Sequence, residues 1–443
     1  MQGTTGGFHV RHLKTLSSCA INKSMLDKSL HVLIAALGSY GDMHPFLGIA
    51  KTMRQRGHRV TIIAPAMYQG LVQTLGFEFV AAGSEQMFSR FADNEDLWHP
   101  ARALGIVAQG VGELLPIYYR EIIQRYVPGQ TVLVYSTLAF GGRLAQETHG
   151  IPATSIHLSP CVLRSIAKPA YLPPLPVAAW QPAWFKRAVY ALVDNLILDP
   201  ALAPPLNAFR ATLGLKPARG IFKDWIHSPD RVIGLFPDWF APMAPDWPEN
   251  TALTGFPLYD ESDVTPLDPE LEAFLATGSP PIAFTPGSAM RHGSAFFKTA
   301  LEACRLLRRR ALLISRHDAH IPTDLPPEVR HVPFAPFGRL LPRCAAIVHH
   351  GGIGTSAQGL AAGIPQVVMP MAHDQTDNGA LLQRLGVGSV VTVKKFTPHR
   401  VARALDRLLH SPAVKAACDE TTRRSGQDDS LAQTARYIED LIC

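Results

Sequence analysis

The sequence has no uninterrupted apolar stretch near the ~20 residues that a membrane-spanning helix needs. It has only six cysteines in 443 residues, and none lies in a C-x-x-C pair. Scattered cysteines indicate reduced thiols in a cytoplasmic protein, and neither a disulfide framework nor a zinc site. No Lys/Arg run with interleaved aromatic residues is present, so we expect no nucleic-acid partner. The net charge of +6 suits an anionic small ligand, or peripheral contact with an anionic inner membrane.

The first 24 residues contain no Asp or Glu and lack the apolar core of a signal peptide. We therefore expect residues 1–28 to be a disordered extension, with Met25 as an alternative start. The full sequence is 47% hydrophobic and 18% charged, which is typical of a globular protein. Its length is enough for two domains, which we place at 29–255 and 256–429.

Short apolar runs alternate with helical patterns in both halves of the chain. Residues 31–37 and 59–64 predict buried parallel strands separated by a helix over 45–56, and the same rhythm returns at 131–157. After an acidic linker it resumes at 281–285 and continues through 369. This alternation predicts two α/β domains, each with a doubly wound parallel sheet.

Residues 160–185 interrupt this rhythm. They are rich in proline and aromatic residues and have few acids. One interpretation is a surface excursion packed by its own side chains. We favour the other, a lipophilic lip for an acceptor, because long loops in compact domains are usually functional or disordered.

The most informative stretch is 347–359, IVHHGGIGTSAQG, in which an apolar strand runs into a glycine turn and a helix start. Backbone N–H groups and the helix dipole at such a turn can hold a diphosphate. The spacing Gly352-x-Gly354-x-x-Ala357, with Asp374 downstream, also matches a dinucleotide fingerprint, which would favour an NAD-dependent oxidoreductase. The pattern lies deep in the C-terminal half, however, and the paired histidines have no role in that interpretation. A buried structural turn is the third alternative.

The stretch resembles the donor site of family 1 glycosyltransferases of the GT-B fold. Several elements of that signature occur here in order: Phe334-Ala335-Pro336-Phe337, His350-Gly351-Gly352-Ile353-Gly354-Thr355, Gly363-Ile364-Pro365 and Asp374-Gln375. The resemblance implies two Rossmann-like domains facing a central cleft, with no metal cofactor. It also implies that the terminal helix, at 430–443, returns to the N-terminal domain.

The resemblance assigns roles in binding a nucleotide-sugar donor. The diphosphate would be held by the turn and by two side chains, His350 and Ser288. Phe334 would stack on the base, and the backbone at Phe337 would read the base edge. Asp374 and Gln375 would bind the sugar hydroxyls. Taken together, the donor-binding residues are Ser288, Phe334, Phe337, His350, Gly351, Gly352, Gly354, Thr355, Gln358, Asp374 and Gln375.

Gln358 departs from the glutamate that relatives using UDP-sugars carry at this position. A neutral side chain there favours a deoxyribonucleotide donor such as a dTDP-sugar. No triad of metal ligands is visible, because the acids of this region are dispersed in loops.

Asp42 follows the first strand and is the candidate general base. From its chemistry alone, an acid in a strand-to-helix turn is more often a helix cap. Bacterial and sterol-directed relatives, however, carry Gly-x-x-Gly-Asp there, as this chain does, and the acid is their proposed base. His44 is the rival catalytic residue.

Outside the donor signature, segments 222–229, 235–242, 246–248 and 254–258 resemble bacterial rhamnosyltransferases that form mono-rhamnolipids. That resemblance implies transfer of L-rhamnose from dTDP-L-rhamnose to a 3-(3-hydroxyalkanoyloxy)alkanoic acid, and association with the enzyme that makes this acceptor. A sterol or polyketide glycosyltransferase using another nucleotide sugar is the alternative within the class. An inactive nucleotide-sugar binding partner is an alternative outside it.

Overall fold

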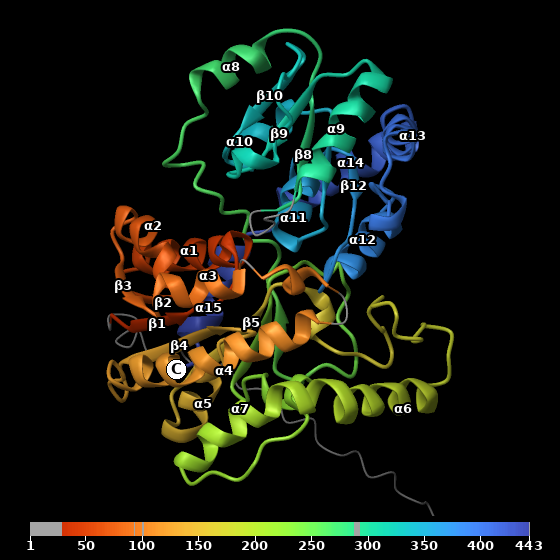
Figure 1. Ribbon diagram of the computed structural model, residues 1–443. Coiled ribbons are helices and arrows are strands. Elements are labelled where there is room, and N and C mark those ends of the chain that lie inside the picture. The colour runs from red at the N-terminus through yellow and green to blue at the C-terminus, as the bar shows by residue number, and fades with distance from the viewer. Residues whose placement is uncertain (1–28, 93, 100–101, 288–292, 443) are drawn as a thin grey trace, which may run out of the picture.

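The computed structural model describes residues 29–92, 94–99, 102–287 and 293–442 (Figure 1). The expectations for residues 1–28 and for Ser288 concern positions outside these ranges. None of the helices in the described ranges is both long enough and apolar enough to cross a bilayer.

Within the described residues, the first half of the chain forms a parallel sheet of seven strands in the order β3-β2-β1-β4-β5-β6-β7. The strands are β1 (His31–Ala35), β2 (Arg59–Ala64), β3 (Glu78–Ala81), β4 (Thr131–Ser136), β5 (Ala153–His157), β6 (Arg231–Gly234) and β7 (Thr251–Leu253). The helices are α1 (Tyr40–Gln55), α2 (Gln69–Thr74), α3 (Glu85–Ala92), α4 (Ala103–Ile123), α5 (Phe140–His149), α6 (Ala183–Val193) and α7 (Asp199–Thr212).

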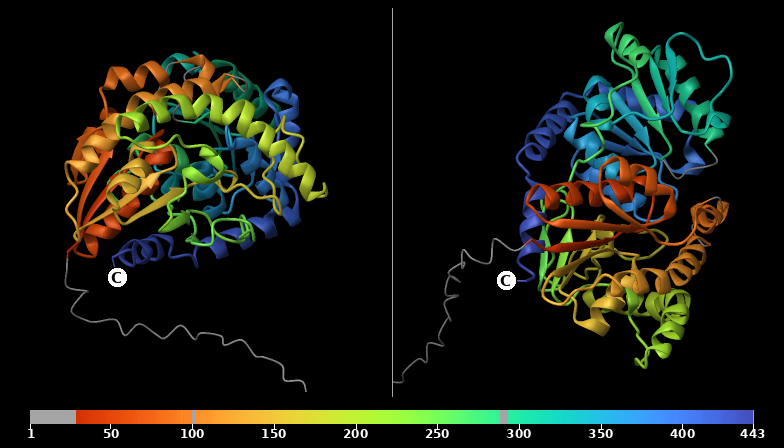
Figure 2. Two further views of the ribbon diagram at one scale, coloured as in Figure 1. Left: turned by 90° about the horizontal axis from the view of Figure 1, so that it is seen from below. Right: turned by 90° about the vertical axis from the view of Figure 1, so that its left-hand side faces the viewer.

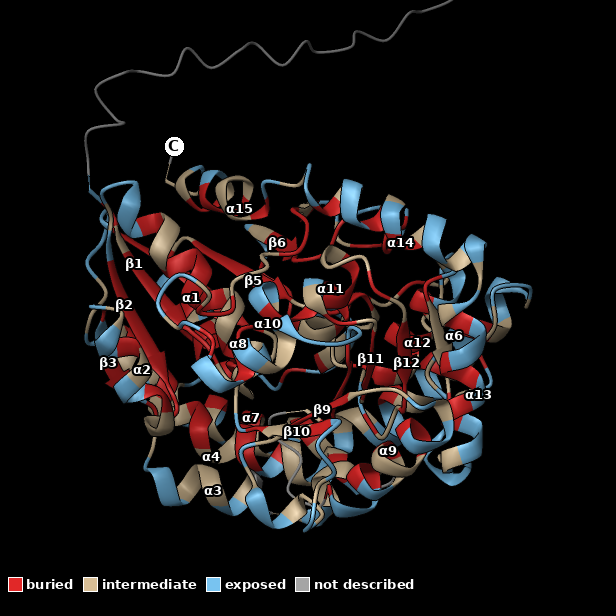
Figure 3. Cartoon of the chain, turned by 90° about the horizontal axis from the view of Figure 1, so that it is seen from above, coloured by how far each residue is buried: buried red, intermediate tan, exposed pale blue. Residues whose placement is uncertain are grey.

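Strand β1 shows why these strands are apolar throughout. Val32 and Ile34 belong to the core on one face of the sheet, and Leu33 and Ala35 belong to the core on the other. Successive side chains of a strand point to opposite faces, so a sheet covered by helices on both sides needs apolar residues at every position. Figure 3 shows the strands as buried and the outer helix faces as exposed.

The second sheet has six parallel strands among the described residues, in the order β10-β9-β8-β11-β12-β13. The strands are β8 (Ile282–Thr285), β9 (Ala311–Ile314), β10 (Val329–Val332), β11 (Ala346–His349), β12 (Gln366–Val368) and β13 (Gly388–Val390). The helices are α8 (Pro269–Ala276), α9 (Ser294–Leu307), α10 (Phe337–Leu340), α11 (Ile353–Ala361), α12 (Gln375–Arg384), α13 (Pro398–Leu409), α14 (Pro412–Ser425) and α15 (Ser430–Glu439). Two Rossmann-like α/β units result, as the sequence predicts.

Helix α15 lies against the first sheet rather than the second (Figure 2). Its Ala435 and Ile438 are buried in the core that α1 shares with β1. At its end, Glu439 accepts hydrogen bonds from Arg56 at 2.7 Å and lies 2.9 Å from a ring nitrogen of His58. The chain therefore crosses back over the connection between the two sheets, while the domain boundaries themselves stay a prediction.

Several elements differ from the expected ones. Helix α1 begins at Tyr40 rather than at residue 45, because Ser39 caps it and Pro45 is accommodated near its start. The expected excursion at 160–185 ends in α6, which begins at Ala183. Strands β6, β7 and β13 have only three or four residues each and were not predicted.

Candidate active site

The carboxylate of Asp42 lies in the first turn of α1, directly after β1. It accepts hydrogen bonds from the backbone N–H of Ser39 at 2.6 Å and from the Ser39 hydroxyl at 2.9 Å. Gly38 has φ of +147°, and a Cβ there would lie 2.4 Å from the Asp42 carboxylate. Glycine is therefore required before the turn, and Asp42 is the N3 residue of a capping box whose N-cap is Ser39, whatever else it does.

The electrostatic surroundings of Asp42 are those of a base. Enclosure by protein raises the pKa of its carboxyl to about 6, the two bonds from Ser39 lower it, and the nearby carboxylate of Asp374 raises it further. Asp374 is the N-cap of α12 in the second half of the chain, so acids from the two halves lie within electrostatic reach of one another. A pKa of about 6 makes Asp42 a better proton acceptor near neutral pH than an ordinary aspartate.

His44 is held by a different group. One of its ring nitrogens, Nε2, lies 2.7 Å from Oε1 of Glu261, in the segment that connects the two sheets. Its ring also makes edge contacts with Tyr40 and Tyr259. The imidazole is therefore part of the contact between α1 and the connecting segment.

The glycine turn joins β11 to α11 at the carboxyl end of the second sheet. Gly351 has φ of +96°, and a Cβ there would lie 2.7 Å from the Val368 side chain. Gly352 is the N-cap of α11, so the N–H groups of the first helical turn have no partner within the helix. A Cβ on Gly354 would lie 3.6 Å from the carbonyl oxygen of Gly41, which places this helix start beside the first turn of α1. Thr355 belongs to the same first turn.

The two histidines before the turn have different roles. Nδ1 of His349 accepts from the Gly351 N–H at 3.1 Å, so its Nε2 carries the hydrogen and donates to Gln366 at 2.9 Å. Burial lowers the pKa of His349 to about 3. This residue is a satisfied core histidine, and it fixes the geometry of the turn.

His350 lies in a slot between two glycines. A Cβ on Gly287 or on Gly352 would come within 2.6 Å of its ring. Its Nδ1 is buried and has no hydrogen-bond partner among the described residues. Burial lowers its pKa to about 4, with a further contribution from His373. A neutral imidazole with an unpartnered nitrogen beside a helix N-terminus is suited to donate to a phosphate oxygen.

Phe334 lies after β10 with its ring covered. The guanidinium of Arg316 lies 4.9 Å from the centre of the Phe334 ring and 4.1 Å from that of Tyr40. Arg316 thus bridges the two sheets at the position where a nucleobase is expected to stack. Phe337 begins α10 and packs against the core of the second sheet.

Three further predicted residues lie on α11 and α12. Gln358 is buried and donates from Nε2 to the carbonyl of Leu258 at 3.2 Å. Asp374 is the N-cap of α12, and burial raises its pKa. The side-chain oxygen of Gln375 accepts from the N–H groups of Met371 and Ala372 at 2.7 and 3.2 Å, which closes the loop before the helix.

Asn378 was not predicted from the sequence. Its side chain connects Asp374 with the glycine turn and with the first half of the chain. Its Nδ2 donates to Asp374 at 2.8 Å and to the Gly351 carbonyl at 2.9 Å, and its oxygen accepts from Ser159 at 3.3 Å. The spacing of four residues from Asp374 on a helix was the available signal.

Two further contacts between the halves were missed as well. The Tyr171 N–H donates to Asp377 at 2.7 Å, and burial raises the pKa of Asp377 to about 6. A ring nitrogen of His373 lies 3.1 Å from the carbonyl of Leu97, and His373 has φ of +59°.

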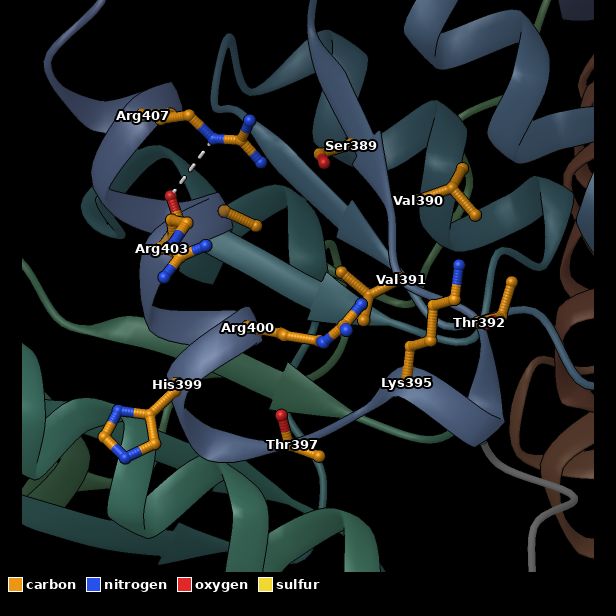
Figure 4. Close-up of a pocket in the computed structure, with 11 residues that line it drawn as sticks. Ser389, Val390, Val391, Thr392, Lys395, Thr397, His399, Arg400, Arg403 and Arg407 are labelled. Atoms are coloured by element: carbon orange, nitrogen blue, oxygen red, sulfur yellow. Dashed lines mark hydrogen bonds between the residues drawn. The ribbon is translucent and has the colours of Figure 1, made fainter.

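A separate groove of about 600 Å³ lies between β13 and α13 (Figure 4). Its lining includes the exposed cations Lys395, Arg400, Arg403 and Arg407, and none of the residues described above for the cleft. In the described ranges no group of three or more His, Cys, Asp or Glu could hold a metal ion.

Known proteins share this architecture. Residues 312–438 match the family described as erythromycin biosynthesis protein CIII-like, C-terminal domain. The O-mycaminosyltylonolide 6-deoxyallosyltransferase of Streptomyces fradiae is 28% identical over 405 residues, which cover 87% of this chain and 91% of that protein. The glycosyltransferase of kitacinnamycin matches with a TM-score of 0.72 at 23% identity, covering 94% and 100% of the two chains. The spinosyn rhamnosyltransferase SpnG, complexed with thymidine diphosphate, matches with 0.64 at 20%, covering 93% and 100%.

In class, the chain is a glycosyltransferase of the GT-B fold. More particularly, residues 312–438 are similar to the EryCIII-like C-terminal domain, and the Streptomyces fradiae relative is named as a 6-deoxyallosyltransferase that acts on a tylonolide. The narrower expectation of a rhamnolipid enzyme is not supported by these matches, which fit the polyketide alternative better. The alternative of an NAD-dependent oxidoreductase rested on the spacing of glycines in this turn. The turn belongs to the second domain of a GT-B fold, so the spacing no longer supports that alternative.

Proposed function

We propose that the enzyme moves a deoxysugar from a dTDP-sugar to a hydroxyl group of a polyketide-type acceptor. The Streptomyces fradiae relative is named for transfer of 6-deoxyallose to a tylonolide, and SpnG for rhamnose transfer with thymidine diphosphate bound. The neutral Gln358, in place of the glutamate seen with UDP donors, supports the same nucleotide. We take dTDP-L-rhamnose as the first donor to test.

The observation that carries the proposal is the position of Asp42, at the start of α1, beside the start of α11 and within electrostatic reach of Asp374. An acceptor oxygen between them would have a base on one side and the sugar on the other. Asp42 takes the hydroxyl proton as that oxygen bonds to the anomeric carbon. The bond from this carbon to the diphosphate oxygen breaks in the same step, which inverts the configuration.

The leaving diphosphate gains negative charge in that step. The unpaired N–H groups at the start of α11 and the neutral imidazole of His350 are the groups that would stabilise it. Asp374, held by Asn378, and the amide group of Gln375 would bind the sugar hydroxyls.

A rhamnolipid-type acceptor is the second candidate. It is favoured by the acid-free, aromatic segment at 160–193, which begins at the cleft and ends on an exposed apolar helix. Both candidates take a lipophilic acceptor. In the first candidate the acceptor is a polyketide ring, and in the second it is a linear fatty-acid dimer.

The test is a competition between acceptors. Purified enzyme with dTDP-L-rhamnose or dTDP-6-deoxyallose is offered a macrolide aglycone and a 3-(3-hydroxyalkanoyloxy)alkanoic acid together, and products are identified by mass. We expect the macrolide glycoside to form faster. Glycosylation of the fatty-acid dimer alone would select the second candidate, and hydride transfer with NAD would overturn both.

A further inference from the structure

Helix α6 turns its apolar side outward. Its buried side chains, with those of the short π-helix η4 (Asp194–Leu198) that continues it, are Lys186, Tyr190 and Asp194. Surface helices of soluble proteins ordinarily do the reverse. The outward side chains include Trp184, Leu192 and Leu196, which are 69%, 60% and 65% exposed, and Trp180 just before the helix is 84% exposed.

Polar contacts fix this orientation. Arg164 donates to Asp194 at 2.6 Å, and its guanidinium lies 4.8 Å from the centre of the Tyr190 ring. The ammonium of Lys186 donates to the carbonyl of Ala179 at 3.2 Å. Rotating the helix to bury Trp184 would break these contacts and leave charges without partners, which is costly in a protein interior. These contacts therefore hold the apolar side of α6 towards the solvent.

A cluster of exposed apolar side chains of this kind marks a binding surface. We call the set Trp180, Trp184, Leu192 and Leu196 the α6 surface. The charges around it decide what it binds. Residues 160–193 contain no Asp or Glu but four cations, of which Arg187 is exposed on α6 itself.

Helix α13, which carries the exposed arginines of the groove, lies on the same side of the molecule as α6 in Figures 1 and 3. Among the described residues, the guanidinium groups of Arg400 and Arg403 have no acidic partner. A second copy of the chain docked through this side would bring like charges together. An anionic surface would complement them.

We propose that the α6 surface docks the protein on the face of a bilayer that contains anionic phospholipid. Tryptophan prefers the boundary between lipid headgroups and acyl chains. A helix with aromatic and leucine residues outward and basic residues beside them lies in the plane of that boundary. The inference does not rest on the proposed reaction, because it needs neither the sugar donor nor the acceptor.

Docking there would bring the cleft close to lipid. The segment that leads from β5 to α6 contacts helix α12 on its way, where the N–H of Tyr171 donates to Asp377. The path from the α6 surface to the cleft is thus one continuous stretch of chain.

The experiment is flotation of the full chain with vesicles. One set contains phosphatidylcholine alone, and the other phosphatidylcholine with an equal amount of phosphatidylglycerol. Four proteins are compared: wild type, the double variant Trp184→Ser/Leu192→Ser, Arg187→Ala and the control Val264→Ser. Val264 is 52% exposed but lies in the segment that connects the two sheets, outside both the α6 surface and the α13 groove. Thermal unfolding checks that all four fold alike.

We expect wild type and Val264→Ser to float with the anionic vesicles and to bind the neutral ones less. The partition coefficient of the double variant should be lower by about tenfold or more, because two apolar side chains that would be buried in the bilayer are replaced by serine. Arg187→Ala should lose about fivefold in low salt. Wild type that stays free of both vesicles, or a double variant that floats like wild type, would overturn the proposal. If wild type were a dimer and the double variant alone a monomer, the α6 surface would be a contact between two copies of the chain, and the proposal would be overturned.

Discussion

Nε2 of His44 lies 2.7 Å from Oε1 of Glu261, and the two residues belong to different parts of the fold. Glu261 lies in the connecting segment, with φ of +67°, and its neighbour Asp263 pairs with Lys51 of α1. His44, the other candidate for the base, thus holds the connecting segment against α1 through its imidazole.

We predict that His44→Asn keeps most of its turnover, whereas its thermal stability falls because the contact with Glu261 is lost. Steady-state kinetics with saturating sugar donor and a melting curve test this together. Glu261→Gln is the matched control, and it should lower stability in the same way. A His44→Asn enzyme that binds dTDP-sugar normally but is inactive would assign the base to His44.

A second prediction concerns His350 and the leaving group. A hydrogen bond to a charged group contributes roughly 1.5–3 kcal/mol, so His350→Ala should weaken dTDP binding by about tenfold or more. In wild type, bound dTDP should also raise the pKa of this imidazole, because burial without a partner holds it at about 4 in the free enzyme. Calorimetry and NMR titration of the ring measure the two effects. Unchanged dTDP affinity in the variant would make His350 a structural residue.

Asn378 gives a third prediction, which separates the sugar from the nucleotide. Removing its amide in Asn378→Ala frees the carboxylate of Asp374, so dTDP-sugar should lose about tenfold or more in affinity. Binding of dTDP should change less, since the amide reaches the diphosphate turn only through the carbonyl of Gly351. The exposed Asn195→Ala is the control. Equal losses for both ligands would mean that Asn378 supports the fold alone.

The local parts of this site could be predicted from the sequence. The glycine turn, His350 and Asp42 lie at strand ends, where hydrophobic periodicity fixes the register and short motifs fix the turn. The contacts of His44 with Glu261, of Asn378 with Ser159 and of Arg316 with Tyr40 could not. Each joins residues more than 200 positions apart. These contacts depend on how the two sheets meet, and no local pattern encodes that.

The fourth prediction is a loss of stability in acid through a buried histidine pair. Nε2 of His157 lies 3.0 Å from Nδ1 of His227, and both rings are buried. Burial lowers the pKa of His227 to about 4 and that of His157 well below its usual value. Above pH 6.5 both the folded and unfolded chains hold neutral rings. As the pH falls from 6.5 towards 4, only the unfolded chain binds the proton, so the free energy of unfolding decreases by about 3 kcal/mol for His227.

Urea unfolding at pH 7 and pH 5 measures this loss. The variant His227→Asn removes one titrating ring, so the difference between the two pH values should shrink relative to wild type. An unchanged difference would show that other groups carry the acid sensitivity.

The most direct test of the whole account is Asp42→Asn, measured for turnover, sugar-donor binding and stability in one preparation. Asparagine has the shape of aspartate, and its side-chain oxygen can still accept the bond from the Ser39 N–H, so the variant should melt like wild type and bind dTDP-sugar normally. It cannot accept a proton, so turnover should fall by about 10²-fold or more. In wild type, kcat/KM should rise with pH around the Asp42 pKa of about 6, and this step should be absent from the residual activity of the variant. A stable Asp42→Asn enzyme with full turnover would contradict the account, because Asp42 would then be a cap and nothing more.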